Sequence, residues 1–293
     1  MSPIVFVLVA GAAVLHVVWN VLLKTAGDPL RAAAVGMGTA AILLCPTVLV
    51  AWLWNGRPSI PAETLALSVV SGVLEAFYFA FLAAAYRRGD LSLVYPLARG
   101  TAPLLAVAIG VILLNERLGP VGTTGVAALL VGLLSLQRPW RYLRAGGREH
   151  GGAAGFALLT GVTIASYSAV DRVGVRGTEP WIYAGLIWAS CAVFLWAYYG
   201  WYRRRGSVAA SVPFSSRRAG VGGLITLAGY FLILTAFTVA PLTAVAPLRE
   251  SAIVLASGWG ALRMREAADR RDAARRLGSA ALVVIGAVLL AID

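Results

Sequence analysis

The sequence predicts an all-α, polytopic membrane protein whose ten transmembrane helices form two inverted five-helix repeats around a central cavity. Its 293 residues are 59% hydrophobic and only 13% charged, with a mean hydropathy of +0.80. A soluble domain carries about a quarter charged residues. About ten apolar stretches approach the roughly 20 residues that a helix needs to cross a bilayer. They are continuous rather than alternating, which excludes a strand-based barrel.

The five spans of the first half are separated by turn and cap residues. The first, 3–25, has no basic region ahead of it, so we expect a retained helix rather than a cleaved signal sequence. The next four begin after or at breakers. These breakers are Asp28-Pro29, Pro58 to Pro61, Gly89-Asp90 and Gly119-Pro120, and the spans are 31–54, 63–86, 91–114 and 119–137.

A polar linker, 138–151, separates the first repeat, 1–137, from the second, 152–293. The second repeat shows the same alternation of apolar runs and polar joints, including Glu179-Pro180 and the stretch 203–217. Its expected spans are 152–174, 181–202, 218–240, 243–264 and 272–292. Five crossings is an odd number, so two copies of such a unit must lie upside down relative to each other.

A shift of 151 residues superimposes the fourth span on the ninth. It brings Pro96 onto Pro247 and Phe79 onto Tyr230. Glu116, just past the fourth span, falls within one residue of the counterpart of Glu266. Aligned proline and glutamate residues are more informative than aligned leucines, because apolar sequences match easily by chance.

The basic residues predict the orientation. The joints that follow odd-numbered spans hold 19 Lys and Arg residues, whereas the other joints hold 4. The positive-inside rule assigns the 19 to the cytoplasmic side, so both termini are expected to face away from the cytoplasm.

Composition also excludes several functions. The net charge of +12 comes from arginines at helix ends, where they meet lipid headgroups, rather than from a nucleic-acid surface. Cys45 and Cys191 lie inside apolar runs and imply no disulfide framework. The only lysine, Lys24, follows Leu23, so there is no Walker A motif and ATP is not expected as a direct fuel.

Enzymatic signatures are missing as well. His16 and His150 are the only histidines, and neither lies in a metal-binding or nucleophile pattern. We expect no metal, no cofactor and no enzymatic activity. The expected partners are the lipid bilayer, a small-molecule metabolite and, as a candidate coupling ion, the proton, with the chain acting as a monomer or weak dimer.

Polar groups inside the spans are the informative residues, because burying them in hydrocarbon costs several kcal/mol unless they are solvated or paired. In the first span, His16, Trp19 and Asn20 share one helical face. They predict a cavity wall with an indole platform, an amide and a titratable imidazole. The alternative is hydrogen bonding between helices near a helix end.

The third span carries a stripe that includes Glu75, Tyr78 and Phe79. Glu75 lies well inside the span, so it is neutral, paired with Arg99, or exposed to a water-filled cavity. Proton coupling through Glu75 is one hypothesis. A purely packing role for the aromatic stripe is the alternative.

The fourth and ninth spans open with matching prolines, Pro96 and Pro247, which predict hinges because each leaves a carbonyl free and permits a bend. Tyr95 precedes the first. Arg99 is expected to hold a substrate carboxylate, and Glu250 an ammonium group. The alternative is an ion pair within the protein.

Three aromatic residues complete the expected lining of the cavity: Tyr167 in the sixth span, Trp188 in the seventh and Tyr230 in the eighth. Gly125 and Gly132 in the fifth span, and Ser279 and Gly286 in the tenth, instead predict close helix packing.

The duplicated five-helix unit and the segment GVILLNERLGPVGTTGVAALLVGLLSL at 110–136 resemble the drug/metabolite transporter superfamily, in its ten-helix EamA-type branch. A weaker echo lies at 260–292 and lacks a clean counterpart of NERLG. The resemblance implies a pseudo-twofold bundle in which helices 1, 3, 4, 6, 8 and 9 surround a central cavity. Family members with both termini in the cytoplasm are familiar, and the arginine count departs from that arrangement.

The function predicted on this basis is a secondary transporter of the bacterial inner (plasma) membrane. It exports small metabolites by alternating access, with amino acids bearing apolar or aromatic side chains as the leading substrates. A multidrug or lipophilic-cation exporter of the same superfamily is the alternative. A membrane-embedded lipid enzyme and a passive channel are less well supported, because paired carboxylates and histidines are scarce and the repeat is typical of carriers.

Overall fold

The computed structural model describes residues 2–25, 28–89, 91–138, 140, 151–205, 214–250 and 270–293. Within these ranges the chain is helical and contains no strand, so the predicted fold class is confirmed. The helices are α1 (Pro3–Thr25), α2 (Pro29–Trp54), α3 (Ala62–Tyr86), α4 (Leu91–Ile112), α5 (Pro120–Gln137), α7 (Gly151–Gly174), α8 (Pro180–Arg204), α9 (Ser216–Val239), α10 (Leu242–Glu250) and α12 (Arg270–Ile292), with a short 3-10 segment, η1 (Val175–Gly177), after α7.

Local capping explains where these helices begin and end. α2 starts earlier than expected because the Asp28 carboxylate accepts a hydrogen bond from the Arg31 backbone N–H at 2.7 Å and proline occupies the first helical position. α4 ends at Ile112, earlier than expected, and Asn115 then adopts a left-handed backbone with φ of 52°. Only the start of the ninth predicted span falls in α10. The remainder of that span, Glu266 and most of the linker 138–151 lie outside the described residues.

Five of the described helices are long and apolar enough to cross a membrane: α2, α3, α7 extended through η1, α8 and α9. Shorter apolar segments occur in α1, α4, α5 and α12. Large apolar side chains such as Val7, Ile42 and Val193 are more than 60% exposed on the outside of the bundle. An apolar outer surface of this kind is compatible with lipid rather than with water.

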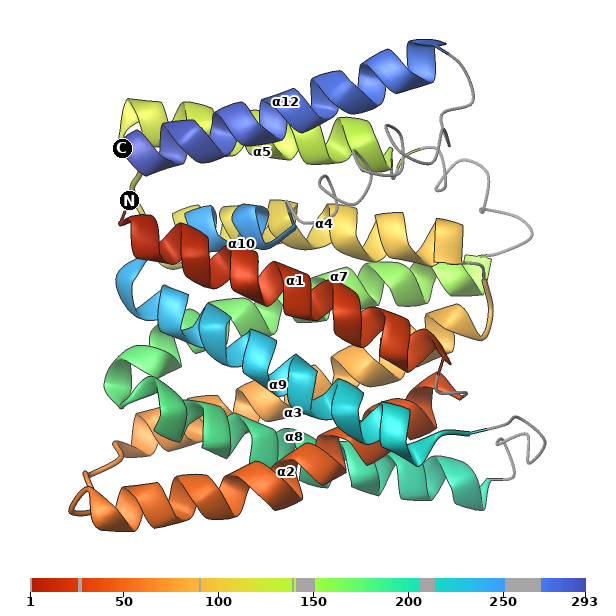
Figure 1. Cartoon of the computed structure of the whole chain (residues 1–293), viewed down its shortest axis with the longest axis vertical. Helices are drawn as coiled ribbons and strands as arrows, with labels where there is room; N and C mark the ends of the chain where they lie inside the picture. The colour runs from red at the N-terminus through yellow and green to blue at the C-terminus, as the bar shows by residue number, and fades with distance from the viewer. Residues whose placement is uncertain are drawn as a thin grey trace.

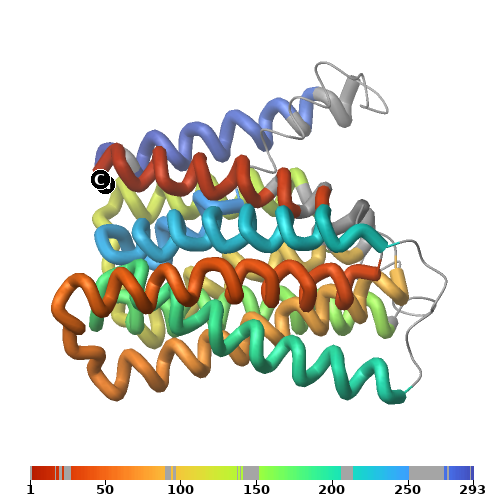
Figure 2. Tube along the Cα trace, turned by 60° about the horizontal axis from the view of Figure 1, so that its bottom comes forward, coloured from red at the N-terminus to blue at the C-terminus, as the bar shows by residue number. Residues whose placement is uncertain are grey.

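The helix axes share one general direction, and helices from the two halves of the chain lie in pairs along the long axis of the bundle (Figures 1 and 2). α5 packs against α12, α4 against α10, α1 against α9, α3 against α7, and α2 against α8. Each pair contains one helix from each half. α1 and α7 run in opposite directions, and both termini lie at the same end of the bundle (Figure 1).

Glu116 ties together the end of the bundle that carries the termini. Its carboxylate accepts hydrogen bonds from the backbone N–H groups of Leu242 and Thr243, at 2.8 and 2.9 Å, and so caps the start of α10. It also pairs with Arg172 at 3.2 Å. Arg172 in turn donates to the Phe237 carbonyl near the end of α9, at 2.8 Å. We call this network the Glu116–Arg172 clasp.

Small residues allow α5 and α12 to pack closely, as expected from the sequence. A methyl group built on Gly125 would lie 2.9 Å from the Gly286 carbonyl oxygen, and one on Gly132 would lie 2.8 Å from the Ser279 carbonyl oxygen. Both clashes are with backbone, which cannot rotate away.

We therefore predict that Gly125→Ala lowers the thermal stability of the purified protein, because α5 and α12 must move apart to admit the methyl group. Gly278→Ala on α12 is the matched control, since no atom lies within 4 Å of the added methyl group. Alanine favours a helix over glycine by about 1 kcal/mol, so the control should melt at the same temperature or higher. Equal melting temperatures for the two variants would contradict the assignment.

Candidate functional site

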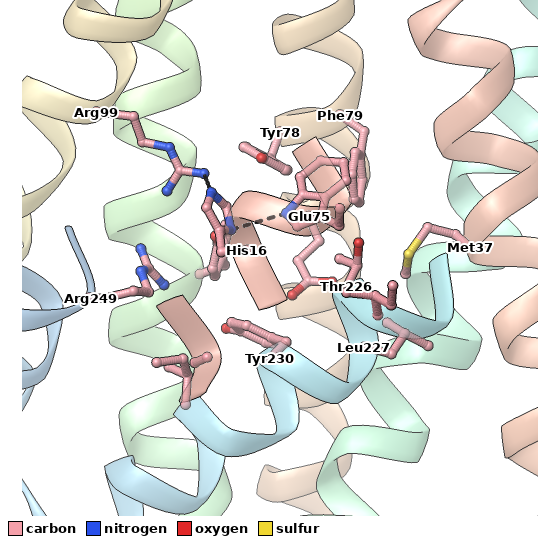
Figure 3. A pocket seen from close by; sticks show the side chains of 16 residues that line it. His16, Met37, Glu75, Tyr78, Phe79, Arg99, Thr226, Leu227, Tyr230 and Arg249 are labelled. Atoms are coloured by element: carbon pink, nitrogen blue, oxygen red, sulfur yellow. Dashed lines mark hydrogen bonds between the residues drawn. The ribbon is translucent and has the colours of Figure 1, made fainter. Parts of the chain in front are cut away.

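A cavity lies in the middle of the bundle, among α1, α3, α4, α7, α9 and α10, with one residue from α2 (Figure 3). It encloses about 630 Å³, including its open part, which is within the usual range for small-molecule sites. The lining residues are Ala12, His16, Trp19, Met37, Glu75, Tyr78, Phe79, Arg99, Tyr167, Ile225, Thr226, Leu227, Gly229, Tyr230, Ile233 and Arg249. The six main helices are those that the resemblance implied.

Eight of the candidate site residues meet at this cavity: His16, Trp19, Glu75, Tyr78, Phe79, Arg99, Tyr167 and Tyr230. Helical spacing brings them there, because positions three and four apart project from one face of a helix. Their role in binding stays a prediction.

Two arginines share one glutamate at the α4–α10 wall. The Arg99 guanidinium contacts the Glu250 carboxylate at 3.0 Å, and Arg249 contacts the same oxygen at 3.4 Å. Glu250 is only 2% exposed and does not line the cavity. In this structure Glu250 forms an ion pair within the protein, which was the alternative expected from the sequence, and its carboxylate is not turned toward the cavity.

Arg99 and Arg249 themselves border the cavity, on the same side of His16 (Figure 3). Arg99 hydrogen-bonds to His16 Nε2, and Arg249 reaches Ser168 Oγ at 3.5 Å. Within the described residues, one carboxylate is shared by two guanidinium groups, so the described part of this wall holds more basic than acidic side chains.

Aromatic rings connect the arginine side to the rest of the cavity. The Trp19 indole donates to His16 Nδ1 at 3.0 Å, and Trp19 packs edge-on against Phe79 with centroids 6.1 Å apart. Tyr78 contacts Phe79, and Tyr167 meets both Tyr78 and Tyr230 in edge-to-face geometry. These rings offer apolar and stacking contacts.

The carboxyl groups lie deeper in the bundle. Glu75 lines the cavity and is 6% exposed. Asp171 on α7 is completely buried and accepts hydrogen bonds from Tyr183 at 3.1 Å and from Tyr230. Among the described residues, neither carboxyl group has a Lys, Arg or His nitrogen within ion-pair distance.

Other candidate residues are placed differently. Trp188 is buried outside the cavity lining, and its indole nitrogen has no hydrogen-bond partner within the described part of the chain. The side chains of Asn20, Tyr95 and Pro96 lie outside what the structure describes. Pro247 lies within α10, and Pro96 falls within the bounds of α4. Their hinge role stays a prediction.

Sequence reasoning missed Arg249, Asp171, Met37 and Thr226. Two of these had a usable signal. Asp171 follows Tyr167 by four residues, which puts both on one face of α7. Thr226 is separated from Glu75 by the repeat distance of 151 residues.

This architecture defines a class of protein: a multi-pass helical membrane protein whose central cavity is partly charged and partly aromatic. Residues 3–137 match the EamA-like transporter family, so an EamA-like transporter domain occupies the first half of the chain and the family recognition is confirmed there. The family to which this domain belongs is one of membrane transporters in the drug/metabolite superfamily.

Comparison with solved structures supports the fold over the whole chain. One, described only as a crystal structure of a protein, shares 19% sequence identity and a TM-score of 0.68, with 99% of this chain and 97% of that chain covered. This similarity concerns the fold alone. A comparison with curated protein sequences gave no match.

The shared glutamate leads to a stability prediction. Glu250→Gln should lower the free energy of unfolding by about 3–5 kcal/mol, because it leaves two buried guanidinium groups without their carboxylate. Glu63→Gln, at the exposed first turn of α3, is the control and should change it by less than about 0.5 kcal/mol. Denaturant titration in detergent measures both. A double-mutant cycle with Arg99→Gln should show coupling, and simple additivity would argue against the ion pair.

Proposed function

We propose that this protein is a secondary transporter that exports small zwitterionic metabolites, with amino acids bearing apolar or aromatic side chains as the leading substrates. The observation that carries the proposal is the distribution of charge in one cavity. Two guanidinium groups border one side, and a carboxyl group and several aromatic rings line the same cavity.

The chemistry of each wall matches one part of such a substrate. Guanidinium groups bind carboxylates through paired hydrogen bonds, which suits Arg99 and Arg249. Glu75 lines the same cavity without a cationic partner among the described residues, so it can receive an ammonium group. Phe79 and Tyr230 supply apolar and stacking contacts for the side chain.

Alternating access is supported by the relation between the two halves. Four pairs of cavity-lining residues are each separated by the repeat distance of 151: His16 and Tyr167, Glu75 and Thr226, Tyr78 and Gly229, and Phe79 and Tyr230. Helices of one half also pack against helices of the other, and α1 runs opposite to α7 (Figure 1). An inverted repeat, 1–137 and 152–293, gives such a pattern and places its binding site between the halves.

Arg99 and Glu250 are separated by the same 151 residues and touch each other. Equivalent residues of a twofold repeat meet only near the axis, so this ion pair is a natural pivot or latch between the halves.

A second, smaller cavity shares Trp19, Met37, Phe79 and Thr226 with the first and extends toward the starts of α2 and α9. It supports access from the arginine-rich end, while the Glu116–Arg172 clasp holds the opposite end together.

The decisive experiment is counterflow in proteoliposomes. Vesicles loaded with unlabelled phenylalanine should accumulate labelled phenylalanine from outside. Phenylalanine amide, which lacks the carboxylate, should compete poorly. Arg249→Gln should weaken apparent affinity by roughly 10–100-fold, the value of a lost charged hydrogen bond. Arg217→Gln, the same change at an exposed position of α9, is the matched control. Failure of every common amino acid to exchange would reject the proposed substrate class.

A lipophilic-cation exporter is the second candidate, favoured by the chain of aromatic rings beside two carboxyl groups without cationic partners in the described residues. The same variants separate the two. Export of a cationic dye should be unchanged in Arg249→Gln and lost in Glu75→Gln, whereas the apparent affinity for an amino acid should fall in Arg249→Gln.

We infer further that the protein works in a bacterial inner membrane with its arginine-rich end in the cytoplasm, in keeping with the 19-to-4 bias of basic residues. Both termini then face the periplasm. Alkaline phosphatase fused to the C-terminus should be active, and a green fluorescent protein fused there should stay dark. The reverse pattern would show that the arrangement common in the family applies here.

A further inference from the structure

Asp171 is a completely buried carboxyl group with no cation beside it among the described residues. Glu116 and Glu250 each pair with an arginine, but within the described residues no Lys, Arg or His nitrogen lies within 4 Å of Asp171. An unpaired carboxylate inside a membrane protein costs several kcal/mol and is retained where it has a function. The surroundings of Asp171 must therefore provide for a bound proton or a cation.

The hydrogen-bond partners of Asp171 leave room for a proton rather than for a larger cation. Tyr183 donates to Oδ1 and Tyr230 donates to Oδ2, so both oxygens already have a donor, which by itself stabilises the carboxylate form. A protonated carboxyl group needs one acceptor in addition. The Ser71 hydroxyl on α3 faces Asp171, is fully buried, and makes no hydrogen bond of acceptable geometry within the described residues. A hydroxyl group both donates and accepts, so Ser71 can donate to the carboxylate and can accept from the carboxyl group once a proton is bound.

Other groups around Asp171 come from every neighbouring helix. Glu75 faces it from α3, Tyr183 from α8, Tyr230 from α9 and Arg249 from α10. Glu75 is the other unpaired carboxyl group and adds negative charge nearby. Arg249 adds positive charge from a distance but makes no ion pair with Asp171 among the described contacts.

Tyr230 links this group to the substrate cavity. Its ring lines the cavity, while its hydroxyl donates to Asp171. Ser71 belongs to the first half of the chain, whereas Asp171 and both tyrosines belong to the second. A movement of α3 against α7 therefore changes the environment of Asp171 at the same time as it reshapes the cavity.

We propose that Asp171 is the site at which a proton binds and is released in each transport cycle, which makes the protein a proton-coupled antiporter. This inference rests on the proposed transport function. The proton enters from the side of higher acidity, resides on the carboxylate with its O–H directed at Ser71, and leaves on the other side. No electron transfer or covalent step is involved.

The experiment separates exchange from coupling in proteoliposomes. Counterflow of phenylalanine without a pH gradient reports transport alone, and a pH-sensitive dye inside the vesicles reports proton movement. Wild type should show both, with proton flux dependent on phenylalanine. Asp171→Asn keeps the shape of the side chain but exchanges one accepting oxygen for a donating NH2 group and cannot ionise. It should keep counterflow but reduce phenylalanine-dependent proton flux to the level of protein-free vesicles.

The outcomes distinguish the two proposals. No counterflow in wild type rejects the proposed function. Counterflow with equal proton flux in wild type and Asp171→Asn overturns the role of Asp171 while the transport function stands. Absence of proton flux in wild type overturns it too, as does loss of flux in Glu75→Gln but not in Asp171→Asn.

A second variant covers the case in which Asp171→Asn does not fold. Ser71→Ala removes a hydroxyl that stabilises the carboxylate form, so the midpoint of the pH profile of transport should move about half to one unit higher. Ser68→Ala is the matched control, because the Ser68 hydroxyl is buried one turn earlier and already donates to the Leu65 carbonyl at 2.8 Å. Identical midpoints for the two serine variants would also overturn the proposal.

Discussion

The contact between Arg99 and Glu250, 3.0 Å apart in the interior of the bundle, is the interaction on which the rest of the site depends. A charge in this environment persists only with a partner. Glu250 is shared by Arg99 and Arg249, so the described part of the cavity wall holds more basic than acidic side chains. The Arg99–Glu250 pair joins α4 to α10, one helix from each half, and its two residues are separated by the proposed repeat distance of 151. The Arg99–Glu250 contact therefore affects both the charge of the cavity wall and the packing of the two halves against each other.

Around that pair, the cavity is asymmetric even though its helices are paired. His16 has Tyr167 as its counterpart, and Glu75 has Thr226. Each pair contains one titratable or acidic group from the first half and a hydroxyl group from the second. Two similar scaffolds therefore carry different chemistry, which gives a substrate two distinguishable ends to bind. An exactly symmetric cavity would bind a zwitterion in either direction with equal affinity.

The fold was predictable because the bilayer imposes its length on every helix. Apolar runs bounded by Asp28-Pro29 or Gly119-Pro120 correspond to α2 and α5 within two residues. The stripe of Glu75, Tyr78 and Phe79 was also predictable, since helical periodicity alone brings these residues to one face. The direction of the Glu250 side chain was not predictable. Neighbouring residues on a helix point about 100° apart, and only packing against α4 and α7 decides whether Arg249 or Glu250 meets the cavity. Asp171 was overlooked because it lies near the end of its apolar span, where a charge is unremarkable in sequence.

The Glu116–Arg172 clasp has a consequence for leakage through the bundle. One carboxylate satisfies two backbone N–H groups at the start of α10 and holds the arginine that satisfies a carbonyl near the end of α9. If the clasp separates, these polar groups lose their partners together, and all of them need water at once. In a partly separated clasp, most of these polar groups have lost their hydrogen-bond partners, but little water has entered to replace them. The corner therefore behaves as an all-or-none closure, which disfavours half-open states in which a continuous water column would let ions short-circuit the membrane potential.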